Sequence, residues 1–246
     1  MPELPEVETT RRGVLPLLGG RKVTAVHVHD HRLRQPVTDG LASILVGRRL
    51  NAVERRAKYL LFVFEHGTLL VHLGMSGSLR VVPRKAPRLL HDHVEIEFGT
   101  ERVLRLRDPR RFGLVLWTRE DPAGHALLNK LGPEPFDDLF SGSYLFERSR
   151  GRTLAVKNFV MDAHIVVGVG NIYASEALFR AGIRPGRAAG RVSRVRYDAL
   201  ALHAVTVLRE SIEAGGTTLR DFYAQRRRTG LFQPEPQGLW SPGRSV

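Results

Sequence analysis

The hydrophobic pattern of this chain changes its period once, near residue 120, and that change limits the folds open to it. Before this point, short runs alternate apolar and polar residues, which is the two-residue period of half-buried strands. Turn signals such as Glu65-His66-Gly67 and Gly99-Thr100 separate these runs. After it, the apolar residues recur at helical spacing. We therefore predict an α+β protein, in which an N-terminal β-sandwich is followed by an all-helical domain.

The expected elements and boundaries follow from the same pattern. Strands are predicted over residues 22–29, 48–50, 59–64, 68–73, 79–82, 93–98, 102–106 and 113–117. Helices are predicted over residues 124–131, 144–150, 153–161, 172–181 and 195–214. We expect a β domain over residues 1–120, a linker over 121–135, a helical domain over 136–222 and a separate tail over 223–246. The cleft between the two domains is the expected ligand site.

The first residues carry a specific chemical option. Removal of Met1 makes Pro2 the N-terminus, and α-amino groups titrate near ~8, far below a lysine. An unprotonated secondary amine can attack a sugar carbon and form an iminium, and Glu3 is placed to exchange protons with the opening ring. Pro5 in a first turn and Gly19-Gly20 at the end predict a helix between them. A capped surface helix with a chance proline fits the same residues.

The charge balance indicates what kind of partner to expect. Lys and Arg number 38 against 25 Asp and Glu, which gives a net charge of +13. This excess favours nucleic acid first and an acidic membrane surface second, although an uninvolved basic surface also fits. With no long apolar span and no signal peptide, we expect a soluble cytoplasmic protein that has no membrane partner. Cysteine is absent, which excludes disulfides and a thiolate zinc site.

Six sequence blocks resemble, in the same order, those of the bacterial formamidopyrimidine-DNA glycosylases. These blocks are residues 2–13, 55–61, 72–80, 108–113, 166–176 and 215–222. Leu4 separates the chain from the related endonuclease VIII branch, which usually carries Gly there. The resemblance implies a β-sandwich beside an N-terminal helix, then a helix–two-turn–helix domain. It also implies a monomer that acts on double-stranded DNA containing oxidised purines or abasic sites.

The resemblance further implies an activity and assigns residues to it. Pro2 attacks C1′ of the damaged nucleotide, the base (8-oxoguanine or a formamidopyrimidine) leaves, and β,δ-elimination nicks the strand. The implied catalytic residues are Pro2, Glu3 and Lys58. The implied DNA contacts are His91, Arg110, Arg152, Lys157, Gly170 and Asn171, with Arg110 bonding to the orphaned cytosine. The implied void-filling residues are Met75 and Phe112.

Several of these residues also have ordinary structural explanations. Lys58 fits a surface lysine, and Gly170 fits a plain turn before a helix. Met75 and Phe112 are residue types of protein cores, yet Phe112 follows two arginines on a loop between strands. An apolar side chain exposed there suits a wedge that fills the gap left by a flipped base. His91 has another histidine two residues away, but no third ligand has suitable spacing, so we predict no metal site.

The end of the sequence departs from the family. Relatives continue into a hairpin that binds one structural zinc through four cysteines and carries a minor-groove arginine, and this chain has none of these residues. One interpretation of residues 224–246 is a disordered basic tail. Another is a one-base frameshift near Tyr223–Ala224, because codons read one base forward permit a peptide like the missing segment. We expect no cofactor in this chain. An active enzyme, a DNA-binding protein without turnover and a zinc-independent relative stay open as functional hypotheses.

Overall fold

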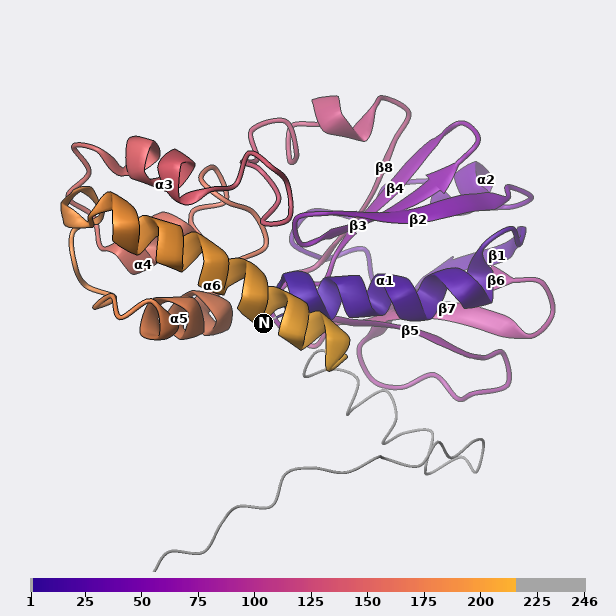
Figure 1. The fold of residues 1–246 in the computed structure, drawn as a ribbon. Helices are drawn as coiled ribbons and strands as arrows, with labels where there is room; N and C mark the ends of the chain where they lie inside the picture. The colour runs from indigo at the N-terminus through magenta and orange to yellow at the C-terminus, as the bar shows by residue number, and fades with distance from the viewer. Residues whose placement is uncertain (1, 216–246) are drawn as a thin grey trace, which may run out of the picture.

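The computed structural model describes residues 2–215 and has the predicted α+β architecture (Figure 1). The β-sheets lie on one side of the molecule and a group of helices lies on the other. Helix α1 (Leu4–Leu18) runs along the sheets, with its first turn beside the helical group. Met1 and residues 216–246, which include most of the sixth family block and the predicted tail, lie outside the described residues.

The sandwich consists of two four-stranded antiparallel sheets. The first sheet has the order β1 (Val23–Val28), β6 (Asp92–Phe98), β7 (Arg102–Arg107) and β5 (Ser78–Pro83). The second has the order β2 (Leu50–Arg56), β3 (Tyr59–Phe64), β4 (Gly67–His72) and β8 (Leu114–Thr118). Alternate residues of both sheets face inward, as in Phe62 and Phe98, and Val14 and Leu18 of α1 join the same core.

The second domain is helical. Its elements are α3 (Gly142–Ser149), α4 (Val156–Met161), α5 (Asn171–Arg180), a 3-10 turn η2 (Ala189–Arg191) and α6 (Arg194–Glu213). Helix α6 packs against both α3 and α5. Tyr197 of α6 is fully buried, and its hydroxyl donates to the carbonyl of Ala189 at 2.9 Å. No helix within residues 2–215 is long and apolar enough to cross a membrane.

Two predicted elements were wrong, and one short helix was missed. Residues 124–131 do not form a helix: after the 3-10 turn η1 (Pro122–Gly124), the chain continues in turns. The apolar residues there are explained instead by Leu128, which packs with Leu61 and Leu70 on the second sheet. Strand β2 extends through residues 50–56 rather than 48–50, and the short helix α2 (Leu41–Leu45) was not predicted.

Candidate functional site

The N-terminal segment is inserted between the two domains. The amide of Leu4 donates to the carbonyl of Gly168 at 3.1 Å, and the Leu4 side chain is part of the helical domain's core. A Cβ at Gly168 would lie 2.4 Å from the Leu4 side chain, and Gly168 has a φ of +78°. Only glycine tolerates both the close approach of Leu4 and this left-handed backbone conformation. Because Val7 already belongs to the sandwich core, the start of α1 connects both domains and places Pro2 at their junction.

The carboxylate of Glu3 is held by the N-terminus of α5. Its Oε2 accepts from the amide of Gly170 at 2.8 Å, its Oε1 accepts from Ile172 at 3.1 Å, and only 1% of the residue is exposed. Free amides and the helix dipole favour an anion at this position. A Cβ at Gly170 would lie 2.3 Å from Cδ of Glu3. The expectation that this amide faces a DNA phosphate is therefore corrected, because it donates inward to a carboxylate.

A second set of hydrogen bonds fixes the same segment. Glu6 accepts from the backbone amide of Glu3 at 2.9 Å and from the hydroxyl of Tyr173 at 2.7 Å. The Tyr173 hydroxyl also lies 2.7 Å from the hydroxyl of Ser211 on α6. Burial, together with the bond to Glu6, raises the pKa of Tyr173, so it stays a protonated donor. Helices α1, α5 and α6 are thus connected through one carboxylate.

Lys58 reaches the same junction from the sandwich. It lies in the tight turn between β2 and β3, where Ala57 has a left-handed φ of 55°. Burial lowers the pKa of Lys58, and the nearby carboxylates of Glu3 and Glu6 oppose that shift. A lysine with a lowered pKa exchanges its proton more readily near neutral pH. The structure therefore brings the predicted catalytic residues together, and Pro2 lines a small cavity of about 20 Å³ beside them.

The turn that carries Lys58 is anchored by Glu134, a residue to which the sequence analysis gave no role. Its carboxylate accepts from the amide of Ala57 at 2.7 Å, from Arg55 at 2.7 Å and from Arg56 at 3.0 Å. Arg55 also contacts Glu8 of α1 at 3.3 Å. Burial alone raises the pKa of Glu8, but hydrogen bonds from arginines outweigh it and hold the pKa at about 2. Glu134 falls in the linker predicted over residues 121–135, and nothing in that segment predicted this contact.

The two predicted void-filling residues are exposed and lie on adjoining loops. The exposed fractions are 42% for Met75 and 44% for Phe112. Gly74 approaches the Phe112 backbone so closely that a Cβ would lie 2.4 Å from its carbonyl carbon. Buried Asp108 joins the loops, since it accepts from Ser76 at 3.0 Å and from the Gly113 amide at 2.7 Å. Other large apolar side chains of the described residues are exposed too, but these two lie together on adjoining loops, and that placement supports insertion into a partner.

The predicted DNA contacts of the sandwich lie near these loops. Arg110 is exposed, and its guanidinium carbon lies 4.8 Å from the centre of the Phe112 ring. His91 is half-buried and adopts a left-handed φ of 71°. His93 is buried and bonds through Nε2 to the carbonyl of Asp108 at 2.8 Å, so it supports the loop. In residues 2–215, no three His, Cys, Asp or Glu side chains converge as metal ligands.

The remaining predicted contacts lie in the helical domain. Asn171 is exposed at the first residue of α5, which leaves its side chain free to meet a phosphate that the Gly170 amide cannot meet. Lys157 is half-buried on α4, and no hydrogen-bond or ion-pair partner of its side chain is found among the described residues. The guanidinium carbon of Arg152 lies 5.6 Å from the centre of the Phe159 ring. Their roles stay predictions.

This combination of a β-sandwich, a helical domain and a buried carboxylate beside Pro2 defines a DNA-repair glycosylase. Two family models match the chain: the formamidopyrimidine-DNA glycosylase N-terminal domain over residues 1–115, and the formamidopyrimidine-DNA glycosylase H2TH domain over residues 131–223. The chain belongs to the formamidopyrimidine-DNA glycosylase family, as its sequence predicted.

Individual relatives agree with this assignment. Formamidopyrimidine-DNA glycosylase of Syntrophotalea carbinolica is 62% identical over 94% of this chain and 86% of its own length. The enzyme of Alkalilimnicola ehrlichii is 57% identical over the same shares. Among solved structures, the Lactococcus lactis enzyme bound to DNA containing an abasic site has a TM-score of 0.82 at 29% identity, and covers 89% of this chain and 85% of that one. A complex with DNA containing carbocyclic 8-oxoguanine has the same TM-score at 30% identity, over 88% and 82% of the two chains.

Proposed function

We propose that this DNA glycosylase excises oxidised purines from double-stranded DNA and then nicks the strand as an abasic-site lyase. The substrates of base excision are 8-oxoguanine and formamidopyrimidines. Abasic sites are substrates of the lyase step alone. The observation that carries the proposal is the junction of Pro2, Glu3 and Lys58. Glu3 is fixed next to Pro2 by two amides of α5, and Lys58 faces the same carboxylate with a lowered pKa.

The chemistry follows from these groups. Once Met1 is removed, the lone pair of the Pro2 nitrogen forms a bond to C1′, and the bond from C1′ to the damaged base breaks. The departing base takes the electron pair of the broken bond. Glu3 takes the proton that the Pro2 nitrogen loses and passes it to the ring oxygen as the sugar opens, which leaves an iminium between Pro2 and C1′. The iminium acidifies the C2′ proton, and loss of this proton expels the 3′ phosphate in the β-elimination. Loss of a further sugar proton then expels the 5′ phosphate in the δ-elimination. Lys58 is positioned to move protons in these steps.

The remaining residues hold the DNA in a bent, opened form. Met75 and Phe112 fill the space of the flipped nucleotide, and Arg110 bonds to the cytosine left without its partner. His91, Arg152, Lys157 and Asn171 contact phosphates, and Gly170 contributes by making room for Glu3. These assignments rest on the family motifs, and the exposure of Met75, Arg110, Phe112 and Asn171 agrees with them.

The reaction proposed here needs no cofactor, because the iminium itself is the electron sink. The structural zinc of the family would belong to a segment after residue 222, outside the described residues. We propose further that the protein acts as a cytoplasmic monomer.

A borohydride trap tests the proposal. The protein is incubated with a duplex containing 8-oxoguanine opposite cytosine, and borohydride reduces any iminium to a stable amine. We expect a covalent protein–DNA adduct whose modified peptide begins at Pro2, and we expect none with Pro2→Gly. A protein that binds the lesion duplex without any adduct or strand nicking would instead be a binding protein without turnover, and the proposal would be wrong.

A further inference from the structure

A second pocket lies on the sandwich, at the end of the second sheet opposite the catalytic junction. The cavity has a volume of about 570 Å³. It is lined by Ser43, Ile44, Arg48, Phe64, His66, Trp117 and Arg119. Strand β3 begins beside Lys58 and ends at Phe64, and five residues at ~3.3 Å each separate the two ends by roughly 17 Å. The pocket is therefore remote from Pro2.

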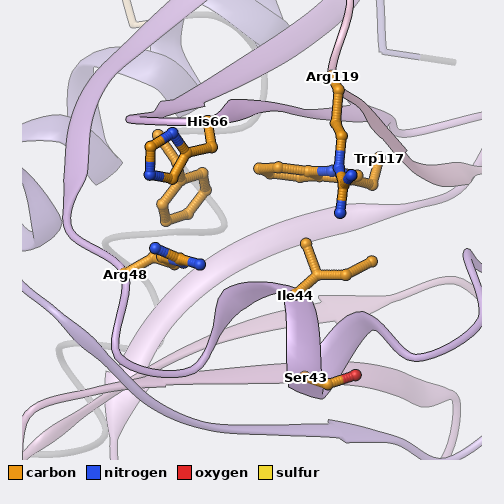
Figure 2. A pocket seen from close by; sticks show the side chains of 7 residues that line it. Ser43, Ile44, Arg48, His66, Trp117 and Arg119 are labelled. Carbon is orange, nitrogen blue, oxygen red and sulfur yellow. The ribbon is translucent and has the colours of Figure 1, made fainter.

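The pocket has a fixed aromatic wall. The centres of the Phe64 and Trp117 rings are 5.9 Å apart at an interplanar angle of 55°. The indole also lies against the backbone of Gly67, where a Cβ would come within 2.5 Å of Cζ2 of Trp117. The backbone amide of Trp117 donates to Thr38 at 2.8 Å. Figure 2 shows the indole and Ile44 on opposite sides of the pocket. A flat ring could stack on this wall.

The rest of the lining is cationic. Arg48 and Arg119 are exposed, and neither forms an ion pair with another residue of the described chain. His66 adds a third basic group, although Glu65 lies 3.8 Å from it. None of the seven lining residues is acidic. Figure 2 shows Arg48 and Arg119 entering the pocket from opposite sides. Two unpaired guanidinium groups favour a phosphate, which arginine binds through paired hydrogen bonds.

We propose that this pocket binds a nucleotide, with the base stacked on Trp117 and the phosphate held by Arg48 and Arg119. An aromatic platform beside arginines is the arrangement that proteins use for unpaired nucleotides. The cavity volume is also within the range of small-ligand sites. The nucleotide is either free in solution or part of a single strand. An acidic peptide would use the arginines but would leave the indole wall without a matching ring.

Trp117 itself reports binding. The chain contains two tryptophans, so Trp240→Phe leaves Trp117 as the only one. In this background we expect 2′-deoxyguanosine 5′-monophosphate to quench the fluorescence saturably. Deoxyguanosine should bind more weakly, and inorganic phosphate should compete without quenching. A 5′-phosphorylated single-stranded tetramer that binds more tightly than the monophosphate would identify a strand as the source, and equal or weaker binding would identify the free nucleotide.

Charge-reversal variants locate the site. Arg48→Glu combined with Arg119→Glu should weaken nucleotide binding about tenfold or more. Lys130→Glu combined with Arg148→Glu changes the net charge by the same amount, at exposed positions outside the pocket. This control variant should bind the nucleotide as tightly as the wild type. Excision of 8-oxoguanine should persist in both variants, so the outcome is independent of the proposed catalytic function. Absence of saturable quenching, equal binding in the two variants, or binding of an acidic peptide in place of nucleotides would overturn the proposal.

Discussion

Glu134 offers the sharpest test of how this protein positions Lys58, the lysine proposed to move protons in the reaction. Its carboxylate, 14% exposed, accepts hydrogen bonds from Arg55, Arg56 and the amide of Ala57. Removing one partner of a buried ion pair costs about 3–5 kcal/mol. Arg55 keeps its contact with Glu8, and Arg56 keeps the carbonyl of Gly132. We therefore expect Glu134→Ala to lower the free energy of unfolding by roughly 2–3 kcal/mol, at or just below the lower limit of that range.

For a protein of this size, the loss corresponds to a drop in Tm of roughly 5–10 °C, at about 2–4 °C per kcal/mol. In Glu134→Ala the turn that carries Lys58 also loses the hydrogen bond from the Ala57 amide to the Glu134 carboxylate. We expect the single-turnover excision rate, measured well below Tm, to fall on the order of tenfold, which is about 1.4 kcal/mol in activation free energy. The affinity for the lesion duplex should change little, because Glu134 contacts no predicted DNA-binding residue.

Two variants complete the experiment. Glu134→Gln keeps an oxygen for the Ala57 amide but loses the charge, so its Tm and excision rate should lie between those of the wild type and Glu134→Ala. Glu101→Ala removes an exposed glutamate of the sandwich that does not contact the Lys58 turn, and it should change neither quantity. If Glu134→Ala had the Tm and the excision rate of the wild type, the argument that this carboxylate positions Lys58 would be wrong.

The remaining predictions concern the nucleophile, the DNA contacts and pH. Pro2→Gly should abolish or cripple base excision in a gel assay while duplex binding survives, and a wild-type rate would refute the role of Pro2. Lys157→Ala should reduce the slope of log affinity against log salt by about one, and an unchanged slope would remove Lys157 from the phosphate contacts. Burial and nearby positive charges lower the pKa of His72 from 6.5 to about 4 in the folded protein. Between these two pH values the unfolded chain takes up a proton that the folded protein does not, so the free energy of unfolding present above pH 6.5 decreases as the pH falls toward 4. Urea unfolding should show that loss, of roughly 3 kcal/mol, in the wild type but not in His72→Asn, whose side-chain oxygen can still accept from Gly74.

Much of the sandwich could be predicted from the sequence because its signals are local. Strand β3 was predicted exactly, and β6 and β7 were predicted to within one residue, because alternation and a Gly-containing turn specify a hairpin between them. The prediction failed for residues 124–131, where apolar residues at helical spacing serve a different purpose. Leu128 packs onto the outer face of the second sheet without helical backbone, so tertiary contacts overrode the periodic pattern.

The candidate site was predicted less completely. The family motifs named Pro2, Glu3 and Lys58, and the structure brings them together. The contacts that hold them could not be predicted, because they join residues far apart in the chain. Glu134 bonds to an amide 77 positions away, and Glu6 bonds to a tyrosine 167 positions away. No local pattern carries such information, since each partner also fits an ordinary surface or linker position.

The turn before α5 shows how a correct physical rule can identify the wrong anion. Free amides at a helix start do favour negative charge, and the sequence therefore indicated a phosphate. The anion in the structure is the carboxylate of Glu3, while Gly168 and Gly170 supply the space that Leu4 and Glu3 need. Helix α5 thus fixes Glu3, the proposed proton-exchanging group, next to Pro2, the proposed nucleophile. Because Lys58 comes from the sandwich and Glu3 is held by the helical domain, the proposed catalytic residues stay together only while α1 is packed against both domains.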